Sequence, residues 1–281
     1  LCGMKTLFVT DLDGTLLGSD SRVSEKSREI ITDLTRRGGL VTVATARTPA
    51  TVEPLLAGTE TAVPAVVMTG ASLWDRRGRC FVDPVLFGQD SVGPVSECFL
   101  GHGVYPFIYS VTDDNRLTVY RGVAPLSRTE ENFCRERRGL ALKRFVFSRP
   151  GGYGGAFPGA ILLLGISAIE RIEALADALR GRGGLSVSAY ADIFNPKVGY
   201  IEVFAAGVSK AEAVMRLKRE TGADRLVVYG DNLNDLTMFE VADEAVAVAN
   251  ARPEVKERAA RVIGPNTADA VARDMAEVSG L

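Results

Sequence analysis

Short apolar runs punctuate this chain, and each stops abruptly at small or polar residues. The runs cover residues 7–9, 40–44, 65–68, 226–229 and 245–248. Runs of this length, rich in Val, Leu and Ala, are typical of buried strands. Between the first two runs, Ser24 is a preferred N-cap residue for an amphipathic helix that continues to about Arg37.

The order of these elements predicts a parallel sheet. A helix that begins at Pro49 separates the second and third strands, and Ser209 is expected to cap a helix that precedes residues 226–229. Strand, helix and strand at this spacing are joined by right-handed crossovers in a parallel sheet. The polar residues that follow the strands are therefore expected to meet at one edge, where open α/β sheets bind ligands.

The middle of the chain has a different texture. Two strands are expected at 104–110 and 117–121 around an Asp-Asp-Asn turn, followed by a charged helix at 130–140, a strand at 160–164 and an amphipathic helix at 169–179. A segment of this length can form a domain of its own. We therefore predict an α/β fold, in which residues 1–83 and 189–281 form a Rossmann-like parallel-sheet core and residues 84–188 form an inserted α+β domain.

Composition narrows the functional classes. The 281 residues are 46% hydrophobic and 24% charged, as in globular proteins, and the net charge of −2 gives no electrostatic basis for binding nucleic acid or an anionic membrane. No apolar run is long enough to span a membrane, and no signal-peptide pattern occurs. The scattered cysteines (Cys2, Cys80, Cys98, Cys134) suit reduced thiols. We expect a cytoplasmic protein with no obligate protein partner.

The candidate chemistry lies in the polar residues at the strand ends. These are Asp11 and Asp13, then Thr45, then Lys210 at a helix start, and then Asp231, Asn234 and Asp235. Carboxylates gathered beside a lysine predict a Mg²⁺ site, because this ion prefers oxygen ligands and takes several from water and substrate phosphate. The lysine would balance the phosphate charge, and the Thr45 hydroxyl and backbone N–H groups near Leu12 and Thr69 would bind other oxygens. Each motif alone is also compatible with a solvated turn.

Four motifs resemble those of the haloacid dehalogenase (HAD) superfamily. Asp11-Leu12-Asp13-Gly14-Thr15 resembles the first, Thr45 the second, Lys210 the third and Gly230-Asp231-Asn232-Leu233-Asn234-Asp235 the fourth. The insertion is similar to the large α/β (C2-type) cap of the Cof-type branch, which includes sugar-phosphate and other phosphate-ester phosphatases. The resemblance covers the chain from about Met4 to the last helix. The first and fourth motifs, in this order and at this distance, are highly specific as a pair.

The resemblance implies an enzyme, a Mg²⁺-dependent phosphatase that hydrolyses a small phosphorylated metabolite, such as a sugar phosphate, through an aspartyl-phosphate intermediate. Asp11 would be the nucleophile, and Asp13 the general acid and then the general base. The inserted domain would set substrate specificity.

The resemblance also implies a set of ligands for the ion and for the phosphoryl group. The ion would be held by Asp11, Asp231 and the backbone carbonyl of Asp13, with Asp235 close by or acting through water. The phosphoryl group would be held by Thr45 and Lys210, and Asn234 would orient the metal cluster or the phosphate.

The sequence departs from the family pattern in two loops. The second motif has Ala46 where relatives usually have Gly, and Thr69 stands where many have Asn. Arg47 is interpreted as a structural loop residue, and Asn250 is expected to brace the fourth-motif loop. Two alternatives stay open: a phosphomutase of the same superfamily, and a non-catalytic metabolite-binding protein on this fold. The intact pair Asp11 and Asp13 argues against the second.

Overall fold

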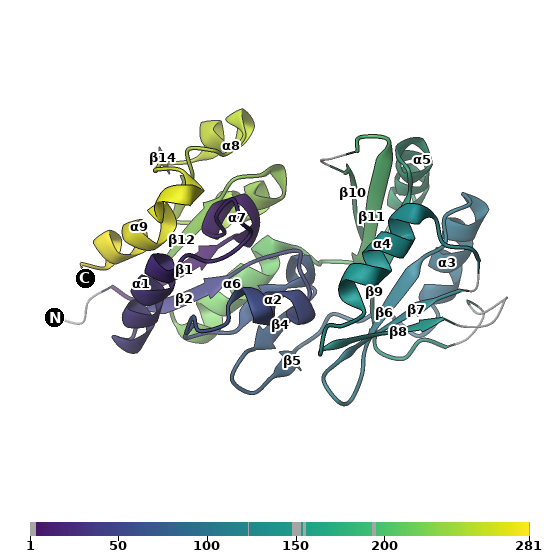
Figure 1. The fold of residues 1–281 in the computed structure, drawn as a ribbon, viewed down its shortest axis with the longest axis horizontal. Helices are drawn as coiled ribbons and strands as arrows, with labels where there is room; N and C mark the ends of the chain where they lie inside the picture. Colours follow the sequence, from purple (N-terminus) through teal and green to yellow (C-terminus); the bar gives the residue numbers. More distant parts are fainter. Residues whose placement is uncertain (1–3, 123, 148–152, 154–155, 193–194, 281) are drawn as a thin grey trace. The chain divides into compact units, whose positions relative to one another are not determined.

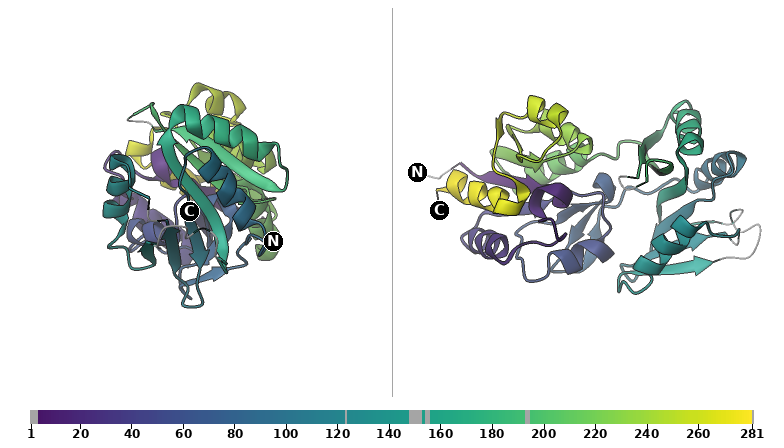
Figure 2. Two further views of the ribbon diagram at one scale, coloured as in Figure 1. Left: turned by 90° about the vertical axis from the view of Figure 1, so that its right-hand side faces the viewer. Right: turned by 45° about the horizontal axis from the view of Figure 1, so that its top comes forward.

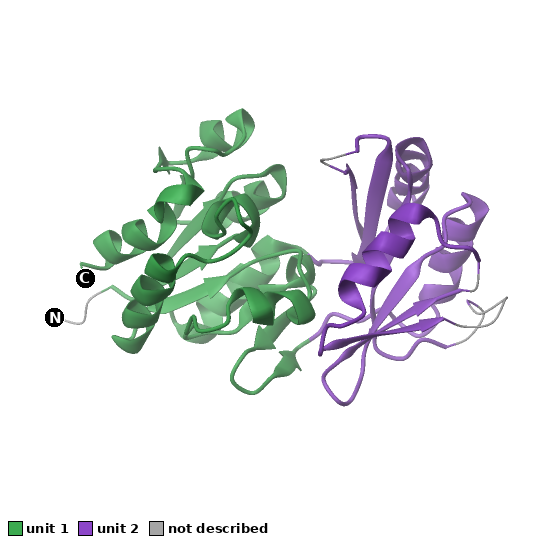
Figure 3. Cartoon of the chain, viewed as in Figure 1, with its two compact units in different colours: residues 1–83, 209–281 green, residues 84–208 purple. Residues whose placement is uncertain are grey.

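The computed structural model describes residues 4–122, 124–147, 153, 156–192 and 195–280. The chain divides into two compact units, coloured separately in Figure 3. The first unit comprises residues 1–83 and 209–281, and the second comprises residues 84–208. The second unit is thus an insertion between two parts of the first.

A five-stranded parallel sheet forms the centre of the first unit (Figure 1). In spatial order its strands are β14 (Arg261–Val262), β13 (Glu244–Ala247), β12 (Arg225–Gly230), β1 (Thr6–Thr10) and β2 (Leu40–Val43). Leu7 of β1 lies in register with Leu226 on one side and Leu40 on the other. The chain passes from β1 to β2 on one side of β1 and resumes with β12 on its other side. The strand order therefore reverses at β1, and open α/β folds bind ligands at such a point.

Helices cover both faces of this sheet. The helix α1 (Glu25–Arg36) connects β1 to β2 and packs beside α9 (Ala270–Ser279), as Figure 2 also shows. The helix α7 (Leu236–Val241) connects β12 to β13 and packs against α6 (Lys210–Thr221). Right-handed crossovers that run in opposite directions place α1 and α7 on opposite faces. Two further short helices of this unit are α2 (Pro49–Leu55) and α8 (Pro253–Arg258).

Two predicted helix starts are confirmed by their capping hydrogen bonds. The Ser24 side chain accepts a hydrogen bond from the Ser27 N–H at 2.9 Å, and the Ser209 side chain accepts one from the Glu212 N–H at 3.1 Å. Each bond satisfies a backbone donor in the first helical turn, where no intrahelical partner exists.

The predicted third parallel strand is only marginally part of the parallel sheet. The strand β3 (Ala65–Val67) pairs antiparallel with β4 (Ser72–Asp75), which pairs with β5 (Cys80–Val82). A single parallel bridge, between Ala44 and Val66, joins β3 to the end of β2 in the described structure. The chain reverses after β3 because Met68, Thr69 and Gly70 all have positive φ angles, so the next segment folds back as a hairpin.

The second unit contains a six-stranded sheet. Its strands, in spatial order, are β10 (Leu185–Ala191), β11 (Val198–Ala205), β9 (Ala160–Ala168), β6 (Phe107–Val111), β7 (Leu117–Arg121) and β8 (Lys143–Phe147). The pairing is antiparallel except between β7 and β8. A parallel sheet in the first unit and a mixed sheet in the inserted unit together confirm the predicted fold class.

Helices pack on both faces of this second sheet. The helices α3 (Val92–Gly101) and α5 (Ile169–Arg180) bury a core with Ile108 and Leu163. Phe107, next to Ile108 and therefore on the other face, lies with its ring centroid 5.4 Å from that of Phe133 in α4 (Arg128–Arg137).

The second unit ends later in the chain than the sequence predicted. Residue 188, the expected end, falls inside β10, and β11 pairs with both β10 and β9. The unit therefore continues to Val208. The sequence gives little sign of this pairing, because most β10 side chains are half-buried or exposed and form no continuous apolar run.

Two further expectations concern cysteines and membranes. Cys80, Cys98 and Cys134 are free thiols, and Cys2 lies outside the described residues. Within the part of the chain that the structure describes, no helix combines the length and apolar character that crossing a bilayer requires.

Candidate active site

The candidate site begins where β1 ends at Asp11. The backbone N–H of Asp11 donates to the Tyr229 carbonyl at 2.9 Å, which extends the pairing of β1 with β12 by one residue. The chain then turns tightly through Leu12–Leu16, with Gly14 at a φ of +77°. Asp11, a residue only 6% exposed, is left at the carboxyl edge of a central strand.

Asp231, at the end of the neighbouring strand β12, lies against this turn. The Thr15 hydroxyl donates to Asp231 Oδ1 at 2.8 Å. A Cβ atom on Gly14 would lie only 2.4 Å from Asp231 Oδ2. The turn therefore requires glycine twice over, because of its backbone angle and because of this close approach.

Lys210 links the two carboxylates that flank it. Its ammonium Nζ donates to Asp11 Oδ1 at 2.6 Å and to Asp235 Oδ1 at 2.9 Å, and its side chain is fully buried. The start of α6 is held close to the loop after β3, since a Cβ atom on Gly70 would lie 2.1 Å from the Ser209 carbonyl oxygen. This packing carries Lys210 to the sheet edge.

Asp235 also organises the loop that carries Asp231. Its second oxygen, Oδ2, accepts the backbone N–H groups of Asp231 at 3.0 Å and Asn232 at 3.1 Å. Asp235 is completely buried. Asn234, in contrast, is exposed, and its side chain makes no hydrogen bond to any residue that the structure describes.

Three of these carboxylates can share a cation. Asp11, Asp231 and Asp235 each offer an oxygen, and the three oxygens lie within 4.8 Å of one another. With these groups and Lys210 ionised, the cluster carries two net negative charges, and all its members are buried except Asp231, which is half-buried. Buried charge of one sign needs compensation. The donor set, made of carboxylate oxygens alone, therefore fits a hard divalent cation such as Mg²⁺.

The pKa values of the cluster reflect the same imbalance. Burial raises the pKa of Asp11 to about 7, against the opposing effect of Lys210. Burial also raises the pKa of Asp231 to about 6, with Thr15 opposing the shift and Asp235 adding to it. Burial disfavours the charged form of Lys210, but Asp11 and Asp235 outweigh it and raise the pKa of that ammonium above its usual value. A bound cation would favour the ionised carboxylates.

Asp13 is not one of the three clustered carboxylates and pairs with Arg47. Arg47 Nε lies 2.6 Å from Asp13 Oδ2, and Arg47 Nη2 lies 2.7 Å from Asp13 Oδ1. The sequence does not predict this contact, and Arg47 is interpreted there only as a structural loop residue. No sequence signal marks it, because 34 residues separate the partners.

The loop after β2 places Thr45 in contact with the backbone of Arg47 and Thr69. Thr45 is buried, and its hydroxyl oxygen accepts the Arg47 N–H at 3.1 Å, while the hydroxyl proton has no acceptor among the residues that the structure describes. The Thr69 N–H donates to the Thr45 carbonyl at 3.1 Å. This one N–H is therefore already paired, and the binding of phosphoryl oxygens by backbone N–H groups near Leu12 and Thr69 stays a prediction.

Asn250 braces a different loop from the one predicted. Its Nδ2 donates to the Gly14 carbonyl at 2.7 Å, and its Oδ1 accepts the Asn266 N–H at 2.9 Å. Asn250 therefore supports the turn after β1 rather than the fourth-motif loop. The prediction was wrong because several strand-end loops meet at one edge of the sheet, and the sequence does not show which of them the Asn250 side chain contacts.

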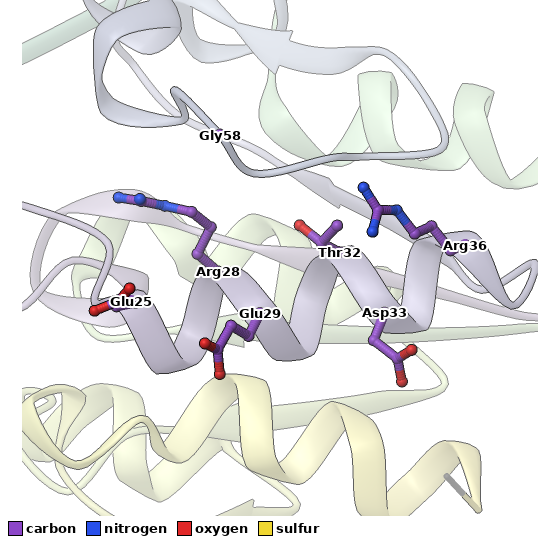
Figure 4. A pocket seen from close by; sticks show the side chains of 7 residues that line it. All are labelled: Glu25, Arg28, Glu29, Thr32, Asp33, Arg36 and Gly58. Carbon is purple, nitrogen blue, oxygen red and sulfur yellow. The ribbon is translucent and has the colours of Figure 1, made fainter.

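A pocket elsewhere in the first unit is separate from the acidic cluster. It has a volume of about 300 Å³, lies along α1 and is shown in Figure 4. Its lining consists of Glu25, Arg28, Glu29, Thr32, Asp33, Arg36 and Gly58. Several of these charges are paired at the surface, Arg36 with Glu60 and Asp33 with Arg37. None of the buried acidic cluster lines this pocket.

Comparison with known proteins decides the family. A family model described as haloacid dehalogenase-like hydrolase matches residues 8–275. The chain belongs to this family. The hydrolase is 26% identical, over 288 residues and 96% of each chain, to 5-amino-6-(5-phospho-D-ribitylamino)uracil phosphatase YwtE of Bacillus subtilis.

Solved structures share the fold of the hydrolase. A haloacid dehalogenase-like hydrolase from Bacteroides thetaiotaomicron has a TM-score of 0.75 and 20% identity, over 97% of this chain and 99% of that chain. The HAD subclass IIB sugar phosphatase BT4131 has a TM-score of 0.73 and 18% identity, over 99% of this chain and 100% of that chain. The predicted assignment to the Cof-type HAD phosphatases, which are phosphoric monoester hydrolases, is confirmed.

Proposed function

We propose that this hydrolase is a Mg²⁺-dependent phosphatase that acts on a small phosphorylated metabolite, such as a sugar phosphate, through an aspartyl-phosphate at Asp11. The observation that carries this proposal is the buried cluster in which Asp11, Asp231 and Asp235 approach within 4.8 Å of one another while Lys210 bridges two of them. Such a cluster is costly without a cationic ligand, and it presents one carboxylate at the ligand-binding edge of the sheet.

The ion would be held by Asp11, by Asp231 and by the backbone carbonyl of Asp13, with Asp235 close by. When bound, it neutralises charge on the transferring phosphoryl group and on the surrounding carboxylates. Lys210 and the hydroxyl proton of Thr45 would hold phosphoryl oxygens, and Asn234 would orient the phosphate or the metal cluster. These donors act on the charge that develops during transfer.

The reaction would proceed in two displacements. An Asp11 carboxylate oxygen attacks phosphorus, and the bond from phosphorus to the ester oxygen breaks as Asp13 gives that oxygen a proton. Asp13, now ionised, takes a proton from a water molecule. The water oxygen then attacks phosphorus, and the bond between phosphorus and Asp11 breaks. Inorganic phosphate leaves, and both aspartates return to their starting states.

The substrate class follows from relatives and from the inserted unit. YwtE is named as a phosphatase of a phosphoribityl-aminouracil, and BT4131 is named as a sugar phosphatase. Both names describe a phosphate ester of a small polyol or sugar. In our proposal the inserted unit, residues 84–208, sets specificity among such esters. A panel of phosphorylated metabolites, assayed with Mg²⁺, would identify the preferred one.

The deciding experiment is the substitution Asp11→Asn. Turnover of p-nitrophenyl phosphate with Mg²⁺ should fall by at least about a thousandfold, because the amide cannot form the acyl phosphate. The thermal unfolding temperature should change little, since asparagine has the same shape and can still accept from Lys210. Asp33→Asn, at an exposed pair with Arg37, is the matched control and should keep full activity. Undiminished turnover in Asp11→Asn would overturn the proposal.

A further inference from the structure

Arg47 makes a two-point contact with Asp13, a residue that the proposed reaction uses twice. One planar guanidinium engages both carboxylate oxygens, at 2.6 Å through Nε and at 2.7 Å through Nη2. This bidentate geometry fixes the direction of a carboxylate as well as its charge. The Asp13 side chain is 52% exposed, so few other contacts restrain it.

Arg47 is itself well anchored. Its backbone N–H donates to the Thr45 hydroxyl oxygen at 3.1 Å, and its carbonyl accepts the Met68 N–H at 2.9 Å. The first bond ties Arg47 to the end of β2, and the second ties it to the end of β3. The backbone of Arg47 is thus fixed by two loops, and its side chain reaches the loop after β1 and binds Asp13 there.

The contact with Arg47 affects how Asp13 can act as a general acid. A general acid must turn a protonated oxygen toward the leaving-group oxygen. A carboxyl oxygen that carries a proton is a donor, and it cannot also accept from the guanidinium along that proton's direction. A proton that takes the lone pair facing the guanidinium opens one of the two hydrogen bonds, while the other keeps the side chain in place.

We propose that Arg47 is the positioning residue for Asp13: it holds the carboxylate in one orientation and releases one oxygen when Asp13 carries the proton for the leaving group. This inference rests on the proposed function, in which Asp13 is the general acid. A competing role for Arg47, direct binding of the substrate phosphate, would act equally on every substrate. The two roles can be distinguished by comparing substrates whose leaving groups differ in their need for a proton.

The test compares two aryl phosphates of similar shape. The p-nitrophenolate group leaves without a proton, whereas phenolate is a poorer leaving group and depends more on Asp13. For both substrates kcat/KM reports the steps up to the aspartyl-phosphate, before Asp13 acts as a base. For Arg47→Ala the ratio of kcat/KM, phenyl phosphate over p-nitrophenyl phosphate, should fall by about tenfold, a part of the roughly 10²–10⁴-fold that a general acid contributes.

Three further variants complete the design. Asp13→Ala should lower the ratio of kcat/KM at least as far as Arg47→Ala does. Arg47→Lys keeps the positive charge but loses the two-point hydrogen bonding of the guanidinium, so it should lower the ratio by a smaller factor. Arg36→Ala is the matched control, because Arg36 also contacts a carboxylate through Nε and Nη2 but pairs with Glu60 at the surface. It should leave the ratio unchanged. Arg47→Gln replaces Arg47→Ala if the latter melts at a lower temperature than the wild type.

Each outcome decides between the roles. An equal loss of kcat/KM on both substrates in Arg47→Ala would mean that Arg47 binds phosphate, and would overturn the inference. An unchanged ratio in Arg47→Ala, with a lowered ratio in Asp13→Ala, would overturn the inference and leave the proposed function intact. An unchanged ratio in Asp13→Ala would overturn the general-acid role of Asp13 and this inference with it.

Discussion

The ammonium of Lys210 lies 2.6 Å from Oδ1 of Asp11, although 199 residues separate the two in the chain. Lys210 stands at the first turn of α6 and Asp11 at the end of β1, so the contact joins the two segments of the first unit across the insertion. A fully buried lysine is tolerated here because carboxylates compensate its charge on two sides.

The substitution Lys210→Met should therefore destabilise the metal-free protein strongly. It leaves Asp11 and Asp235 buried without their shared cation, which costs about 3–5 kcal/mol in comparable buried pairs. Urea unfolding in EDTA measures this loss, and Mg²⁺ should recover part of it by compensating the same carboxylates. Lys26→Met, at an exposed pair with Glu29, should stay within about 0.5 kcal/mol of the wild type. Equal effects of the two substitutions would contradict the role of Lys210.

A methyl group at Gly14 should disrupt the metal site. In Gly14→Ala the new Cβ would meet Asp231 Oδ2 at 2.4 Å, so Asp231 must move. Mg²⁺ affinity, measured by calorimetry, should fall by at least about tenfold, as when supporting contacts of metal ligands are lost. Gly38→Ala is the control, since Gly38 also has a positive φ but has open space around its Cβ position. It should lose about 1–2 kcal/mol of stability from backbone strain and retain its Mg²⁺ affinity.

Mg²⁺ binding should weaken as the pH falls through about 7 to 6. Burial raises the pKa of Asp11 to about 7 and that of Asp231 to about 6, so over this range a proton competes with the cation at both carboxylates. The Thr15 hydroxyl stabilises the ionised form of Asp231, and Thr15→Val should therefore move the midpoint of the binding curve to higher pH. Calorimetric titrations between pH 5 and 8 give both midpoints. A Thr15→Val midpoint at or below that of the wild type would contradict the assignment.

The same raised pKa values predict how metal-free stability depends on pH. Asp11 and Asp231 bind a proton more tightly when folded than when unfolded. Their stabilising contribution is present below the ordinary pKa of aspartate and is lost as the pH rises through about 6 to 7. In EDTA the melting temperature of Asp231→Asn should fall less steeply over this range than that of the wild type. Identical slopes for the two proteins would exclude a stabilising proton on Asp231.

Two neighbouring residues should differ sharply in their effect on stability. Asp235→Asn has only one oxygen to serve three donors, Lys210 and the N–H groups of Asp231 and Asn232. It should cost about 2–4 kcal/mol, because buried donors lose partners. Asn234→Ala should change stability by less than about 0.5 kcal/mol, since Asn234 is exposed. If Asn234 orients the phosphate, KM for p-nitrophenyl phosphate should rise; an unchanged KM would remove it from the site.

The sequence by itself determined that Asp11 and Asp231 reach one sheet edge. Both follow short apolar runs, and the carboxyl ends of parallel strands share an edge, so the local pattern is sufficient. The same pattern predicted the helix starts at Ser24 and Ser209, because a capping bond spans only three residues.

Only the tertiary structure decided which partner each carboxylate takes. Asp11 and Asp13 are two residues apart, yet one turns into the buried cluster and the other toward Arg47, because the turn at Gly14 and its contact with Asp231 set their directions. The insertion likewise extends to Val208 because β11 pairs with β9, a contact between distant segments. Such choices depend on what lies across a loop or a sheet in space, and one-dimensional patterns do not contain that information.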